Sequence, residues 1–488
     1  MTSRLRGVVA AATAVSVVAM IAVAAAGCTT VVKGHGASML YDPFHVGGLL
    51  AVDGPSGPRS NAPQPTGTVE NTDHGDDDNL VLLSVNDIQS FWRSNYSKFF
   101  KGDFKPVDEL VSYDSEDPAS PAVCHHRTYK LINALFSPRC NLIAWDRGVL
   151  IPTGKTYFGS MPITGIFAHE YGHAIQDMAN IAPRGTSTIV LEQQADCFGG
   201  VYMRWVAEGK STRFTLSTGD GLDHVLAGLI TLRDPILTPD DRELIEEGHG
   251  TALDRVSAFQ MGFVSGASAC AAIDDKEVKQ RRGDLPIALT YDQSGRLETG
   301  EVPITEQTLS SLMDTLGAIF ALKSPPQLSY TAAGCADAQA SPPASYCPAT
   351  NTIAVDLAQL QKMGAPGNEQ SGHVLIQGDD TAMSVVMSRY VLAVQHERGR
   401  KLDSPVSALR TACLTGLAHR KMAGPVSVPS GNALTLTAGD LDKAVAGLLT
   451  NHLVASDVNG QTVPAGFTRI TAFRSGVVNT SDDLCYQR

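Results

Sequence analysis

An internal repeat constrains the fold of this chain more than any other feature of its sequence. Landmarks of the first half return roughly 205 to 220 residues later and in the same order. For example, Arg255-Val256-Ser257-Ala258-Phe259 returns as Arg469-Ile470-Thr471-Ala472-Phe473. Similarity of this kind predicts a duplicated structural unit. We therefore expect two tandem copies of one domain, over residues 80–285 and 302–488.

The cysteines follow the same register. Cys28 belongs to an N-terminal export pattern described below, and eight cysteines remain without it. An even number of cysteines in an exported protein indicates disulfides. Eight cysteines allow about 105 pairings, so spacing alone selects none of them. The repeat does select one set, which pairs Cys124 with Cys140, Cys197 with Cys270, Cys335 with Cys347, and Cys413 with Cys485.

The N-terminus has the pattern of an export signal. Two arginines precede an apolar run from Val8 to Ala26, and small residues lead to Cys28. This resembles a bacterial lipobox, although Ala25 stands where leucine is usual. We expect residues 1–27 to be cleaved and Cys28 to be lipidated, with an uncleaved membrane anchor as the alternative. The Gly-, Pro- and Asp-rich residues 28–79 then predict a flexible linker on the outer face of the membrane.

Composition narrows the class of function. The formal net charge is −12, whereas binding to a phosphate backbone requires a surplus of lysine and arginine. Nucleic acid is therefore not an expected partner. Hydrophobic residues make up 43% of the chain, which is enough for packed cores. We expect an α+β fold whose two domains are mostly helical, each with a short sheet.

The segment from Thr164 to Asn180 has apolar residues at helical spacing. His169 and His173 lie four residues apart within it, so both imidazoles share one helix face and can bind one ion. Glu170 follows the first histidine and can take a proton from a water that zinc has activated. The competing interpretation is a surface helix that carries two unrelated histidines.

A second helix is expected from about Ile189 to Glu208. Catalytic zinc takes three protein ligands and keeps one position open, and Glu192 can supply the third ligand. Asp196 lies one turn later, where it can accept a hydrogen bond from a ligand histidine. His249 can stabilise an oxyanion, and Arg255 can orient Asp196 or Glu192. A helix cap and a structural arginine are the alternatives for these two residues.

The order of these motifs resembles a known family. His-Glu-x-Gly-His at 169–173, Glu-x-x-Ala-Asp-Cys at 192–197, Gly-Asp at 219–220 and His-Gly-Thr at 249–251 are similar to the bacterial neutral zinc metallopeptidases, which belong to the gluzincins. The resemblance covers roughly residues 124–270. It implies a zincin-like fold, one Zn²⁺ held by His169, His173 and Glu192, Glu170 as general base, and Asp196 behind a ligand.

The second copy departs from this pattern where the chemistry would lie. Ser388, Arg389 and Leu392 stand opposite His169, Glu170 and His173. Glu192, Asp196 and His249 have their counterparts at Ala408, Ala412 and Val463. A leucine and an alanine offer no ligand atom, and a fixed positive charge repels a divalent cation. We therefore expect a degenerate second domain that binds no metal.

Together these patterns predict a membrane-tethered zinc peptidase that hydrolyses peptide or protein substrates. The alternative is a non-catalytic lipoprotein that serves as a scaffold for an envelope partner. Glu170 favours the enzyme, because a purely structural zinc site has no use for that carboxylate.

Overall fold

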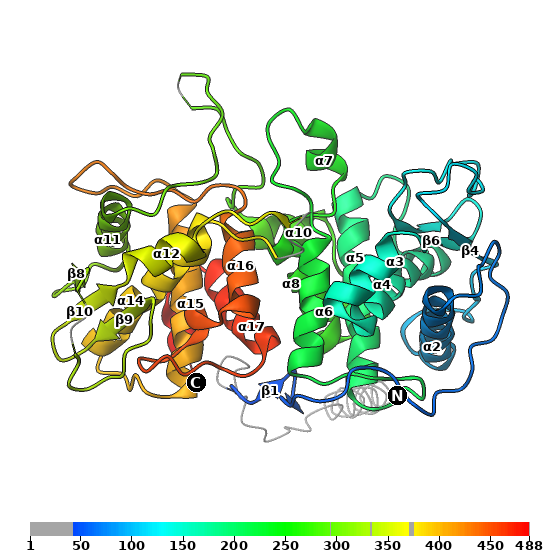
Figure 1. The fold of residues 1–488 in the computed structure, drawn as a ribbon, viewed down its shortest axis with the longest axis horizontal. Coiled ribbons are helices and arrows are strands. Elements are labelled where there is room, and N and C mark those ends of the chain that lie inside the picture. Colours follow the sequence, from blue (N-terminus) through cyan, green and yellow to red (C-terminus); the bar gives the residue numbers. More distant parts are fainter. Residues whose placement is uncertain (1–41, 293, 332–333, 370–374, 488) are drawn as a thin grey trace, which may run out of the picture. The chain divides into compact units, whose positions relative to one another are not determined.

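The computed structural model describes residues 42–487 except 293, 332–333 and 370–374. The expected signal segment and Cys28 lie outside the described residues. Within them the protein is a mixed α+β structure, in agreement with the expected class (Figure 1). None of the helices described between residues 42 and 487 has the length and apolar content needed to cross a lipid bilayer.

The first half combines one small sheet with a set of helices. Strand β6 (Leu142–Asp146) lies in the middle of the sheet, parallel to β4 (Glu109–Tyr113) and antiparallel to β5 (Ala134–Ser137). The helices are α2 (Asp76–Phe99), α3 (Leu150–Phe158), α4 (Ser160–Ala179), α5 (Thr188–Ala207), α6 (Asp220–Thr231), α7 (Arg242–Glu247), α8 (Ala252–Ser265), α9 (Ala267–Cys270) and α10 (Asp275–Arg282).

The second half has the same sheet topology. Strand β10 (Thr352–Val355) lies in the middle, parallel to β8 (Gln327–Ser329) and antiparallel to β9 (Ala344–Cys347). Its helices follow in a similar order and are α11 (Glu306–Phe320), α12 (Leu357–Met363), α14 (Asp379–Glu397), α15 (Pro405–Met422), α16 (Asp440–Thr450), the 3₁₀ turn η2 (Leu453–Ala455), α17 (Gly466–Val477) and α18 (Asp483–Tyr486).

Glycines at matching positions allow the same close helix crossing in both halves. An ideal Cβ on Gly200 of α5 would lie 2.1 Å from the carbonyl oxygen of Phe259 in α8. Its counterpart in α15, Gly416, would meet the carbonyl of Phe473 in α17 at 2.0 Å. Any side chain at these two positions would push the helices apart, so the crossing requires glycine.

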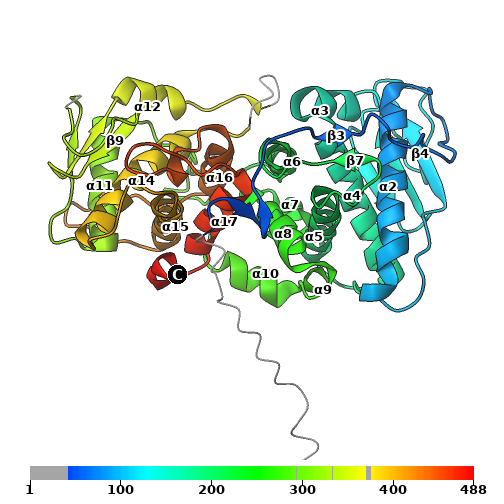
Figure 2. The same ribbon diagram turned by 90° about the horizontal axis from the view of Figure 1, so that it is seen from below.

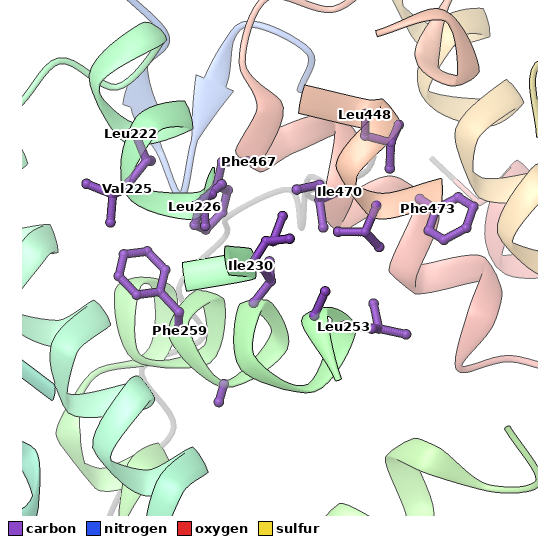
Figure 3. Packing of buried hydrophobic residues seen from close by; sticks show 14 of the residues in the cluster. Leu222, Val225, Leu226, Ile230, Leu253, Phe259, Leu448, Phe467, Ile470 and Phe473 are labelled. Atoms are coloured by element: carbon purple, nitrogen blue, oxygen red, sulfur yellow. The ribbon is translucent and has the colours of Figure 1, made fainter. Parts of the chain in front are cut away.

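Side chains from both halves meet in one apolar cluster. Leu226 and Ile230 of α6 and Leu253 of α8 lie near Phe467 and Ile470 of α17 (Figure 3). Figure 2 shows the same four-helix region from below, with α6 and α8 beside α16 and α17. The ring centroids of Phe263 and Phe467 are 5.1 Å apart across this boundary. Removal of either half would therefore expose a large apolar surface of the other.

All four expected disulfides are confirmed. Cys124 is bonded to Cys140, Cys197 to Cys270, Cys335 to Cys347, and Cys413 to Cys485. Four disulfides indicate that the chain folds in an oxidising compartment. The bridges Cys197–Cys270 and Cys413–Cys485 have equivalent places in the two halves. Each connects a short helix near the end of its half, α9 or α18, to the long helix α5 or α15 of the same half.

Peptide mapping checks this connectivity. Digestion of the non-reduced protein should yield one linked peptide pair for Cys197 and Cys270 and another for Cys413 and Cys485. Reduction before digestion should separate both pairs and provides the control. A bridge between the halves, such as Cys270 to Cys335, would contradict the pairing.

Residues 42–79 differ from the expected flexible linker. Strands β1 (His45–Val46) and β2 (Leu49–Leu50) form a hairpin, and β3 (Gly57–Pro58) pairs with β7 (Phe214–Thr215). The acidic run at 76–78 forms the first turn of α2, where negative charge is stabilised by the helix dipole. The side chain of Asp78 is buried and accepts hydrogen bonds from Ser112 and Trp145. Local composition wrongly predicted a flexible segment here, because the partners of Asp78 lie far from it in the sequence.

Candidate metal centre

Two helices bring together the three expected ligands. Helix α4 carries His169 and His173, and α5 carries Glu192. The Nε2 atom of His169 lies 3.2 Å from Oε2 of Glu192, and Nε2 of His173 lies 3.5 Å from Oε1. The ligand atoms of all three residues are within 4.8 Å of one another. Two imidazoles and one carboxylate therefore converge on one point.

A glycine in the motif makes this convergence possible. An ideal Cβ on Gly172 would lie only 2.7 Å from the Cα of Ala195, so α4 and α5 touch through their backbones here. Glutamate has a short reach, and only a close helix approach lets Glu192 face both imidazoles. The glycine between Tyr171 and His173 therefore has a packing role that spacing alone does not reveal.

Hydrogen bonds hold each ligand imidazole in one orientation. The Nδ1 atom of His169 lies 2.7 Å from Oδ1 of Asp196, and Nδ1 of His173 lies 2.9 Å from Oε1 of Gln176. When each Nδ1 donates its proton to these oxygens, the lone pair of Nε2 points toward Glu192. Gln176 is itself fixed because its amide donates to the carbonyl of Leu191 at 2.6 Å.

Asp196 is held by Arg255. The guanidinium donates to both carboxylate oxygens, from Nε at 2.9 Å and from Nη2 at 2.7 Å. Burial alone would raise the pKa of Asp196, but Arg255 and His169 keep it below its ordinary value. Arg469, which follows Arg255 in the repeat, instead donates to Asp223 and to backbone carbonyls. Arg255 therefore orients a residue of the candidate site, whereas Arg469 binds groups outside it.

The carboxylates make the site attractive to a cation. Burial opposes a charge on His169, yet Asp196 and Glu192 raise its pKa to about 10. Burial likewise opposes a charge on Glu192, and the two histidines nevertheless hold its pKa well below the ordinary value. The Oε2 atom of Glu192 is buried and has no hydrogen-bond partner among the described residues. An N₂O donor set with such an orphaned oxygen fits zinc.

Glu170 lies beside this group without being part of it. Its Oε2 atom accepts a hydrogen bond of 2.8 Å from the backbone N–H of Phe136 in β5. Its side chain is buried, and burial raises its pKa above the ordinary value for glutamate. A carboxylate with a raised pKa in a fixed position suits proton transfer to and from a neighbouring water.

His249 lies at the open side of the group. Its Nε2 atom is 3.7 Å from Oε2 of Glu192, and its side chain is 52% exposed. The carboxylate of Asp234 accepts from the backbone N–H groups of His249 and Gly250 at 3.0 and 2.7 Å. Sequence reasoning missed Asp234 and Gln176, although Gln176, three residues after His173, is within helical reach of it.

A cavity of about 490 Å³ opens beside the candidate ligands, Glu170 and His249. Most of the side chains around it are apolar and come from β5 and from helices α3, α4, α6 and α8. They include Leu135, Phe136, Ile166, Val225, Leu229 and Phe259.

The second half has different chemistry at the corresponding place. Arg389 lies ten residues after the start of α14 (389 − 379), as Glu170 does in α4 (170 − 160). Its guanidinium is fully buried and donates to the carbonyl of Ala344 in β9 and to Ser456, both at 2.8 Å. Among the described residues after 302, potential metal ligands gather at Cys335, Asp337 and Cys347, where the disulfide leaves no thiolate.

Comparisons with known proteins give little further information. No protein-family model matches the chain, and no solved structure matches it. Two curated relatives do match, the uncharacterized protein YpfJ of Escherichia coli strain K12 and the uncharacterized protein YpfJ of E. coli O6:H1. Each is 29% identical over 120 residues, which cover 21% of this chain and 40% of the relative. The chain thus spans about two-fifths of the length of these relatives, and their names carry no activity.

Proposed function

We propose that the protein is a zinc-dependent peptidase of the gluzincin type. One observation carries this proposal: a buried carboxylate that is not a candidate ligand, Glu170, borders both the His169, His173 and Glu192 group and an open cavity. A structural zinc site is closed and needs four protein ligands. Three ligands, a neighbouring base and space for a substrate are the requirements of hydrolysis.

Each residue has a definite role in this mechanism. His169, His173 and Glu192 would hold the ion, and Asp196 and Gln176 would keep the imidazoles aimed at it. Bound zinc supplies a Lewis acid that lowers the pKa of water and polarises a carbonyl. Glu170 accepts the proton of the attacking water and passes it to the leaving amine. His249 donates a hydrogen bond to the oxyanion that forms on the substrate.

The cavity supports a preference for apolar substrates. Most of its lining away from the candidate metal ligands is apolar, so a charged side chain finds few hydrogen-bond partners there, whereas a buried leucine or phenylalanine gains about 1.5–3 kcal/mol. We therefore propose that the enzyme cleaves next to bulky apolar residues.

We further propose that the two halves are tandem copies of a zincin-like domain. The matching strand order, the matching glycine crossings and the equivalent long disulfides support a duplication. The second copy would be the degenerate one, because Arg389 fills the place that Glu170 has in the first. Lipidation at Cys28 would hold the protein at the outer face of the membrane.

Chelation and readdition of metal test the proposed activity. The full protein, incubated with a peptide library, should cleave next to leucine, isoleucine, valine or phenylalanine. A zinc chelator should abolish cleavage, and stoichiometric Zn²⁺ should restore it, while Mg²⁺ serves as the control ion. Cleavage that survives chelation would refute zinc catalysis. Tight zinc binding without cleavage of any peptide would favour the scaffold alternative.

A further inference from the structure

The two halves exchange equivalent helix caps. Asp442 of α16 accepts a hydrogen bond of 2.9 Å from the backbone N–H of Ala252, the first residue of α8. Asp223 of α6 accepts one of 2.8 Å from Gly466, the first residue of α17.

The four residues are related pairwise by the repeat. Asp223 and Asp442 each lie four residues before an Ala-Gly-Leu segment. The two N–H groups each lie three residues before the repeated arginines, Arg255 and Arg469. Residue i of one half therefore contacts residue j of the other, and the reverse contact is present too. Such reciprocity defines a two-fold interface.

One of the two exchanges continues toward the metal centre. Arg233, which follows α6, donates to both oxygens of Glu369 at 2.9 Å and has its Nε 3.4 Å from Asp442. The side chain of Arg233 is only 4% exposed. Its buried positive charge is therefore compensated by these two carboxylates of the second half.

The backbone next to Arg233 leads to two parts of the site. Asp234, the next residue, binds the N–H groups of His249 and Gly250. The carbonyl of Leu232, the preceding residue, accepts a hydrogen bond of 2.5 Å from Arg255, whose other nitrogens hold Asp196. A shift of Arg233 would therefore move both the oxyanion donor and the partner of His169.

The other exchange has no such continuation. Asp223 accepts from Arg469 at 3.0 Å, and this arginine otherwise donates to the carbonyls of Leu448, Val463 and Pro464. None of these groups belongs to the candidate site. The contact of Asp442 is therefore connected to the candidate site, whereas the equivalent contact of Asp223 is not. A substitution at Asp223 is thus a matched control for one at Asp442.

We propose that the degenerate half acts as a built-in positioning partner of the metal centre. Asp442 and Glu369, acting through Arg233, hold the loop of residues 232–251 so that His249 stays beside Glu192. The role of His249 in catalysis rests on the proposed function. The positioning of its loop does not, because it follows from the contacts alone.

Hydrogen exchange tests the positioning without any need for activity. In the full protein, Asp442→Ala should speed amide exchange in residues 234–251 by about fivefold, the effect of losing one helix cap and its ion pair. Asp223→Ala should leave that segment unchanged and instead affect the start of α17. The proposal would be overturned if residues 234–251 exchanged at the same rate in the two variants. It would also be overturned if Asp442→Ala left the exchange of these residues as in the intact protein. Glu369→Gln, at a partly exposed side chain, gives the same test if Asp442→Ala fails to fold.

Kinetics then separate positioning from mere stability. Asp442→Ala and Glu369→Gln should lower kcat by about tenfold with little change in KM and in zinc content, since the oxyanion donor acts in the transition state. In a His249→Ala background, the same substitutions should lower kcat much less than tenfold, because only the route through Arg255 to Asp196 remains. Additive losses would show that they act elsewhere and would refute the role assigned to His249. A complete lack of peptidase activity would refute the proposed function and leave the exchange result to decide the positioning.

Discussion

Glu170→Gln is expected to lower kcat/KM for peptide hydrolysis by about 10²- to 10⁴-fold while zinc stays bound. The substitution removes the base but no ligand. Glutamine keeps the size of the side chain, and its amide oxygen can still accept from the backbone N–H of Phe136. Binding of substrate should persist, because the apolar cavity is unchanged. Measurement of kcat/KM together with metal content separates a lost base from a lost ion.

A matched control for this variant is Glu306→Gln, at an exposed glutamate in the first turn of α11. It makes the same chemical change far from the cavity and should leave kcat/KM unaltered. If Glu170→Gln kept full activity, the proton transfer proposed for Glu170 would be wrong, whatever the metal content.

His169→Ala and Glu192→Ala should each release most of the zinc. The intact protein should hold about one Zn²⁺ per chain, since one group of three free ligand side chains is found among the described residues. Removal of one of three ligands leaves two, too few for a stable site in competition with a chelator. Metal analysis after dialysis gives the stoichiometry. Zinc should also raise the unfolding temperature of the intact protein, because it binds the folded state.

The second half offers a control for the zinc variants. Ser388 lies nine residues after the start of α14 (388 − 379), as His169 does in α4 (169 − 160), and its hydroxyl donates to the carbonyl of Val385. Ser388→Ala should therefore leave the zinc content at one per chain. Two zinc ions per chain, or unchanged zinc in His169→Ala, would disprove the ligand assignment.

Local periodicity predicted the helices of the site well. The helix expected from Thr164 to Asn180 is observed at Ser160–Ala179, and that expected from Ile189 to Glu208 is observed at Thr188–Ala207. Both depend on apolar residues at helical spacing, which a single sequence displays. The repeat predicted the disulfides because it supplied long-range information that spacing does not contain.

The parts that sequence reasoning missed depend on backbone groups and distant partners. Asp234 acts on the N–H groups of His249 and Gly250, and no side-chain motif records such a contact. Glu170 is fixed by an N–H of β5, and the reach of Glu192 depends on a glycine in another helix. Residues 42–79 looked like linker in part because β3 pairs with β7, which lies more than a hundred residues further along the chain.

Under the duplication that we propose, the buried Arg389 makes the divergence of the second half hard to reverse. Its guanidinium donates to Ala344 and Ser456. Burial lowers the pKa of Arg389 to about 10, and the nearby charge of Asp457 partly opposes this shift. A first mutational step to glutamate would bury an anion near Asp457 and leave the carbonyl of Ala344 without a donor, at a cost of several kcal/mol. No metal would bind until positions 388, 392 and 408, which correspond to the three ligands of the first half, also changed. We therefore expect homologous sequences to keep arginine or lysine at position 389 while the residues around it vary. Such a pattern would show that the loss of the glutamate is irreversible in practice.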